Sequence, residues 1–64
     1  MDPYENELFM AAIDDFIRYF GDCDPLVTTE NYAGEKVIVV ESDKKKAIYS
    51  MKVELLKVIN KEEV

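Results

Sequence analysis

Residues 44–60 read KKKAIYSMKVELLKVIN, and the fold depends on whether this stretch forms a helix or a strand. At helical spacing, one face would carry Ala47, Ile48, Met51, Leu55, Val58 and Ile59, with Ser42 or Asp43 as the cap. The residues from 48 to 55 also alternate with a period of two, and three lysines would crowd the positive end of the helix dipole. The length and the good helix formers favour a helix, which we predict from about residue 44 to residue 60. A strand within residues 46–56 is the alternative.

The preceding segment, residues 26–41, has the pattern of a β-hairpin. Residues 26–31 contain a valine and two threonines, and residues 36–41 contain four consecutive β-branched residues, so both are predicted strands. Residues 31–34, Asn-Tyr-Ala-Gly, predict a type I turn closed by a glycine bulge.

The amino-terminal segment predicts a helix from about Pro3 to Phe20. Asp2 is a candidate cap, proline suits the first helical position, and Gly21 supplies the stop. The three phenylalanines are expected in the core. The apolar residues that recur at helical spacing are Leu8, Phe9, Ala12, Ile13, Phe16, Ile17 and Phe20. We expect the four tyrosines, Tyr4, Tyr19, Tyr32 and Tyr49, at edges or tips.

These elements predict one small two-layer α+β domain over residues 1–64. The expected order is α-β-β-α, with two helices covering one face of an antiparallel hairpin. The alternative is α-β-β-β, with one helix on a three-stranded meander. A hairpin alone is only marginally stable, so in either case a helix must pack on it.

The composition is acidic and unevenly distributed. The chain has 14 acidic and 8 basic residues, a net charge of −6, no histidine and one cysteine. Residues 1–35 carry nine acids and one arginine, whereas residues 36–64 carry five acids and seven lysines. The negative half would repel phosphate, so we expect a protein partner with a basic groove and no direct nucleic-acid binding.

Catalytic, metal and cofactor chemistry are not expected. Cys23 has no histidine to act as its base, and the two glycines are too isolated for a phosphate-binding loop. One thiol without histidine does not make a zinc site, and no calcium-loop pattern is present. A lone cysteine fits the reducing cytoplasm. No leader or membrane-spanning pattern is visible, and we expect a complete small gene product.

We predict that acidic and aromatic side chains of the first half bind the partner. The carboxylates would make charge-assisted hydrogen bonds to lysines and arginines, and the tyrosines would add contact area. The candidate binding residues are Glu7, Asp14, Asp15, Tyr19, Asp22, Asp24, Glu30, Tyr32 and Glu35.

In length, acidity and lack of catalytic groups, the chain is similar in kind to small acidic inhibitors encoded by phages and mobile elements. These include anti-CRISPR and anti-restriction proteins. Carboxylates spaced along a rigid helix can imitate a row of phosphates, so we expect inhibition of a host nucleic-acid-binding protein by nucleic-acid mimicry. The plainer alternative is that the acidic surface keeps a small protein soluble. The alternative function is a structural homodimer or assembly subunit. It follows from the wide apolar arc of the first helix and a second stripe, formed by Tyr49, Val53 and Leu56, on the predicted second helix.

Overall fold

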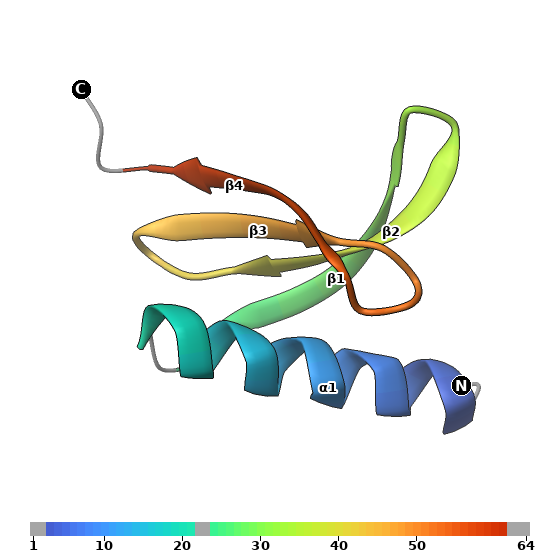
Figure 1. Ribbon diagram of the computed structural model, residues 1–64, viewed down its shortest axis with the longest axis horizontal. Coiled ribbons are helices and arrows are strands. Elements are labelled where there is room, and N and C mark those ends of the chain that lie inside the picture. Colours follow the sequence, from blue (N-terminus) through green and yellow to red (C-terminus); the bar gives the residue numbers. More distant parts are fainter. Residues whose placement is uncertain (1–2, 22–23, 62–64) are drawn as a thin grey trace.

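The amino-terminal helix, α1, spans Pro3–Phe20, as predicted (Figure 1). The computed structural model describes residues 3–21 and 24–61, so the proposed cap Asp2 lies outside the described residues. Gly21 ends the helix at a positive φ of 72°, and its N–H donates to the Ile17 carbonyl at 2.8 Å. This is the left-handed stop expected of glycine at a helix C-terminus.

The predicted hairpin is present, but its turn differs from the prediction. Strand β1 spans Leu26–Tyr32 and β2 spans Glu35–Glu41, with Tyr32 paired to Glu35. Only Ala33 and Gly34 remain as the loop, and both have positive φ, 53° and 83°. The turn is therefore of type I′, whose backbone matches the twist of the strands, and not a type I turn with a glycine bulge.

The predicted helix over residues 44–60 is wrong. This stretch forms two strands, β3 over Lys45–Tyr49 and β4 over Leu55–Asn60. The Ser42 amide donates to the Lys45 carbonyl at 2.8 Å and so closes the turn between β2 and β3. The Ser42 hydroxyl accepts hydrogen bonds from the Lys44 and Lys45 amides at 3.2 and 3.1 Å within this turn. The alternation of apolar and polar residues from 48 to 55 correctly indicated strand structure.

The three-stranded alternative was closer but missed a strand. The Ser50 hydroxyl accepts hydrogen bonds from the amides of Lys52 and Glu54 at 3.1 and 3.3 Å. These bonds bend the chain between β3 and β4, and hydroxyl groups commonly stabilise such turns. The predicted apolar stripe of Tyr49, Val53 and Leu56 is consequently divided among a strand, a turn and a second strand.

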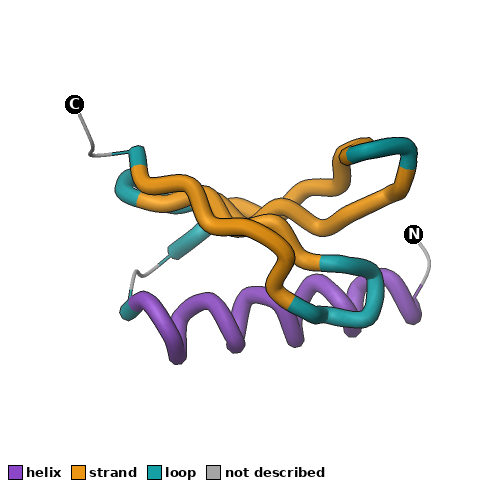
Figure 2. The backbone as a smooth tube through the Cα atoms, turned by 45° about the horizontal axis from the view of Figure 1, so that its top comes forward, coloured by secondary structure: helices purple, strands orange, loops and turns teal. Residues whose placement is uncertain are grey.

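The sheet is a four-stranded antiparallel meander in the order β1-β2-β3-β4, and α1 lies across one of its faces (Figures 1 and 2). The domain is therefore α+β with two layers. The core between the layers consists of Ala12, Phe16, Ile38, Val40, Ala47 and Tyr49. Phe9 and Phe20 pack against this core, which confirms the expected role of the phenylalanines. Val37, Val39 and Ile48 form a second buried group on the other sheet face.

Candidate binding surface

The exposed arc of α1 carries carboxylates near its middle and large apolar side chains on both flanks, with Met10 half a turn of the helix away from Tyr19. Glu7 and Asp14 are exposed there. The side chains of Tyr4, Met10 and Tyr19 are 66%, 64% and 72% exposed. We call Tyr4, Glu7, Met10, Asp14 and Tyr19 the α1 surface. Tyrosine and methionine are enriched in protein interfaces, whereas large apolar groups on a helix normally face the core.

Asp14 is held by the one basic residue of the helix. Arg18 Nη2 donates to Asp14 Oδ2 at 2.8 Å, with both side chains largely exposed. An exposed pair at this spacing contributes only about 0.3–0.5 kcal/mol to stability. The Asp14 carboxylate is therefore only weakly held by this pair.

Asp15 has a structural contact that the sequence did not reveal. Its carboxylate is half-buried and accepts a hydrogen bond from the Tyr49 hydroxyl at 2.8 Å. Tyr49, expected at an edge, is fully buried in the core. Burial raises the pKa of the Tyr49 hydroxyl, and the neighbouring Asp15 carboxylate raises it further. The Asp15 carboxylate thus joins α1 to β3. Its role is structural, and it is not part of the α1 surface.

The other predicted residues lie on the hairpin and in the segment that follows α1. Glu30 and Glu35 are exposed on β1 and β2, and Tyr32 is partly exposed at the end of β1. Asp24 is exposed just before β1, while Asp22 and Cys23 lie outside the described residues. The described candidates therefore lie on the helix, on the hairpin and in the segment just before β1.

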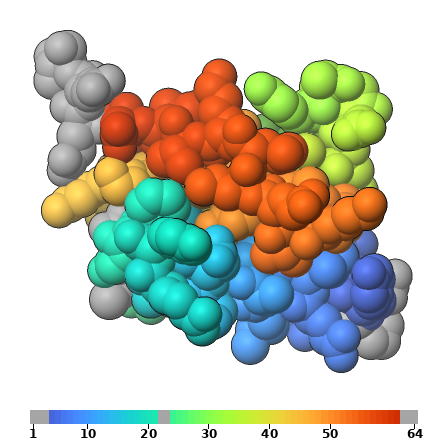
Figure 3. Space-filling model, viewed as in Figure 1, coloured from blue at the N-terminus to red at the C-terminus, as the bar shows by residue number. Residues whose placement is uncertain are grey.

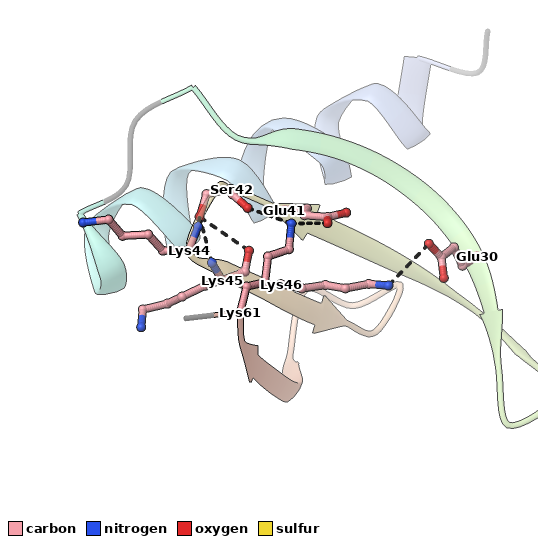
Figure 4. Close-up of polar contacts among 7 residues, drawn as sticks. All are labelled: Glu30, Glu41, Ser42, Lys44, Lys45, Lys46 and Lys61. Carbon is pink, nitrogen blue, oxygen red and sulfur yellow. Dashed lines mark hydrogen bonds and ion pairs between the residues drawn. The ribbon is translucent and has the colours of Figure 1, made fainter. Parts of the chain in front are cut away.

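Lysines of the carboxyl-terminal half neutralise part of the negative charge. Lys36 Nζ lies 3.2 Å from Glu5 Oε2, and Lys46 Nζ lies 4.0 Å from Glu30 Oε2. Lys61 pairs with Glu41, and this hydrogen bond together with the nearby positive charges lowers the pKa of the Glu41 carboxyl (Figure 4). These contacts come from strands that are distant in sequence, so the linear charge count could not reveal them.

The remaining carboxylates define where negative charge is available. Among the described candidates, Glu7, Asp24 and Glu35 make no ion pair with a described lysine or arginine. Helix α1 retains four acids and one base, whereas the described residues from 24 onward hold six acids and seven lysines. The excess of negative charge therefore lies on α1.

Two further findings concern the described chain. In residues 3–21 and 24–61, no three histidine, cysteine, aspartate or glutamate side chains gather closely enough to hold a metal ion. No helix among the described residues is long and apolar enough to cross a membrane.

Comparisons with models of protein families, with curated proteins and with solved structures find no match.

Proposed function

We propose that the chain is a small, non-enzymatic binding module that docks on a basic groove of a protein partner through the α1 surface. The observation that carries the proposal is the presence of exposed carboxylates and exposed large apolar side chains on the same helix. Helix α1 is held to the sheet by Phe16 and by the Asp15–Tyr49 hydrogen bond, so its outer side is presented on a rigid support.

The two kinds of side chain would contribute differently to binding. Exposed charges mainly raise the association rate and fix orientation, whereas buried aromatic contacts supply most of the affinity. Glu7 would attract lysines or arginines of the groove, and a partner arginine would replace Arg18 at Asp14. Tyr4, Met10 and Tyr19 would fill apolar depressions beside those basic residues.

In its more specific form, the proposal is inhibition of a nucleic-acid-binding protein by mimicry, as in the phage and mobile-element inhibitors. Carboxylates on α1, with Asp24 and the hairpin residues Glu30 and Glu35 as a second group, would occupy positions that phosphates take in the partner's natural complex. The partner would then be a host protein in the cytoplasm, and nucleic acid would compete with this chain.

The experiment is capture from host lysate with charge-reversed baits. The test bait carries Glu7→Lys and Asp14→Lys on α1. The matched control carries Asp43→Lys and Glu54→Lys, which reverse two exposed acids in the turns of the sheet and change the net charge equally. The proposal predicts a partner that the wild type and the control retain and that the α1 variant loses.

A purified partner then tests the mimicry. We expect a short nucleic-acid duplex to displace the chain from the partner, and we expect the affinity to fall with salt concentration. Equal retention by both variants would contradict docking through α1. Simultaneous binding of nucleic acid and this chain to the partner would contradict mimicry while leaving the docking surface in place.

A further inference from the structure

Within the part of the chain that the structure describes, strand β4 forms one edge of the sheet and pairs only with β3. Its sequence, Leu55–Asn60, is LLKVIN, with four apolar residues of six. The side chains of Leu55, Leu56 and Ile59 are 45%, 50% and 39% exposed. In Figure 3, β4 (red to orange) lies along the surface of the molecule. Natural edge strands carry proline, charges or a bulge that disfavour pairing. Strand β4 has Lys57 and an irregularity opposite Tyr49, and its residues 57–60 pair regularly with β3.

The other edge of the sheet is protected by its composition. Strand β1 is preceded by Pro25, and its central residues are two threonines and a glutamate. Proline and charge on an edge strand disfavour pairing with a further strand. The two edge strands therefore differ in composition, with four apolar residues of six in β4 and three of seven in β1, namely Leu26, Val27 and Tyr32.

The ladder between β3 and β4 determines which β4 backbone groups are available. The Lys61 amide donates to the Lys44 carbonyl at 2.8 Å. In an antiparallel ladder, hydrogen-bonded pairs alternate with non-hydrogen-bonded pairs. With Lys46 paired to Ile59 and Ala47 paired to Val58, the amides of Ile59 and Lys57 point to β3. The amide and carbonyl groups of Val58 and Asn60 therefore point outward from the edge.

We propose that β4 pairs with β4 of a second copy of this chain, antiparallel and about a two-fold axis, in a register centred on Val58. The two sheets would join into one continuous sheet. Val58 would exchange both hydrogen bonds with Val58 of the second copy, and Asn60 would pair with Leu56. The Val58 and Asn60 groups that this register uses point outward, and Leu56 lies at the irregularity of the β3–β4 ladder.

The charges of β4 select this register from the neighbouring ones. Centring the pair on residue 57 would place Lys57 directly opposite Lys57 of the second copy. Centring it on residue 59 would place Lys57 opposite Lys61. Like charges directly opposite each other are destabilising. The register centred on Val58 instead places Lys57 opposite Ile59 and Lys61 opposite Leu55, so its paired side chains include no like charges.

Pairing about this axis would leave both α1 helices on the same face of the joined sheet. The dimer would therefore present two copies of the α1 surface. The pairing uses residues remote from that surface, so it stands independently of the proposed function.

The test is sedimentation equilibrium of the full chain over a wide concentration range, with two variants at one position. Ile59→Lys would create two like-charge contacts with Lys57 across the axis, and Ile59→Glu would create two opposite-charge contacts. Both remove the same apolar side chain. We expect wild type to dimerise, Ile59→Lys to lower the association constant roughly tenfold or more, and Ile59→Glu to retain it.

Amide hydrogen exchange provides a second readout. The Val58 and Asn60 amides should exchange more slowly as the concentration of the protein rises, whereas those of Lys57 and Ile59, bonded to β3, should not change. Leu26→Lys, on the β1 edge, is the matched control and should leave dimerisation unchanged; thermal unfolding at low concentration checks that each variant folds. A wild type that stays monomeric, or equal weakening by both Ile59 variants, would overturn the proposal.

Discussion

Replacing Tyr49 with phenylalanine tests whether the buried hydroxyl joins α1 to β3. The substitution keeps the ring in the core and removes the donor that lies 2.8 Å from Asp15. A hydrogen bond to a charged group contributes about 1.5–3 kcal/mol, and a half-buried carboxylate regains some water when the donor is lost. We therefore expect Tyr49→Phe to lower the free energy of unfolding by about 1–2 kcal/mol at pH 7.

The same variant should change the pH dependence of stability. The pKa of Tyr49 is raised in the folded state, mainly by burial and then by Asp15. Above pH about 10, the unfolded chain loses the tyrosine proton and the folded chain keeps it, so the stability of the wild type falls as pH rises. This fall is at most about 1.4 kcal/mol per pH unit. Phenylalanine has no such proton, so the stability of Tyr49→Phe does not fall for this reason as the pH rises. At high pH this difference offsets the stability that the variant loses with the hydrogen bond.

Urea unfolding followed by circular dichroism, from pH 7 to pH 11.5, measures both effects. Lysines also titrate in this range but do so in both proteins, so the difference between the two curves reports Tyr49. We expect the wild type to be more stable at pH 7 and the two curves to converge toward pH 11. Tyr32→Phe, at an exposed tyrosine, is the control and should follow the wild type. A constant difference between Tyr49→Phe and wild type at all pH values would refute the reasoning.

Two further predictions concern the turns. Ala33 has a φ of 53°, which is unfavourable for a residue with a Cβ atom, so Ala33→Gly should raise the free energy of unfolding by about 0.5–1 kcal/mol in a urea titration. A loss of stability would contradict the type I′ assignment. Ser50→Ala removes the acceptor for the Lys52 and Glu54 amides and should cost about 1–2 kcal/mol, measured by thermal unfolding. An unchanged midpoint would show that the Ser50 hydroxyl does not stabilise the turn between β3 and β4.

The parts of the fold that were predicted correctly are those that local patterns determine. The apolar spacing up to Phe20 and the stop at Gly21 define α1, and the β-branched run of residues 36–41 defines β2. The carboxyl-terminal third was predicted incorrectly because its apolar residues satisfy both periods. The observed chain turns at Ser50, inside the predicted helix, where the Ser50 hydroxyl and backbone bond to residues 52–54.

The binding residues were predictable only in part. The exposure of Glu7 and Asp14 follows from their helical positions opposite the core. The burial of Tyr49, which makes Asp15 a structural residue, depends on the pairing of β2 with β3. The Lys46–Glu30 pair joins the β3 and β1 strands across β2, which no short-range pattern indicates. The linear charge count treated these carboxylates as one group. Contacts between residues distant in sequence give Asp15 and Glu30 partners within the fold, so the group divides.

The most direct test of docking through α1 is an NMR titration of isotope-labelled protein with the captured partner. We predict that the amide signals of Tyr4, Glu7, Met10 and Asp14 shift or broaden, whereas that of Lys57 on β4 does not. Perturbation confined to the sheet, with the α1 signals unchanged at saturation, would contradict the account.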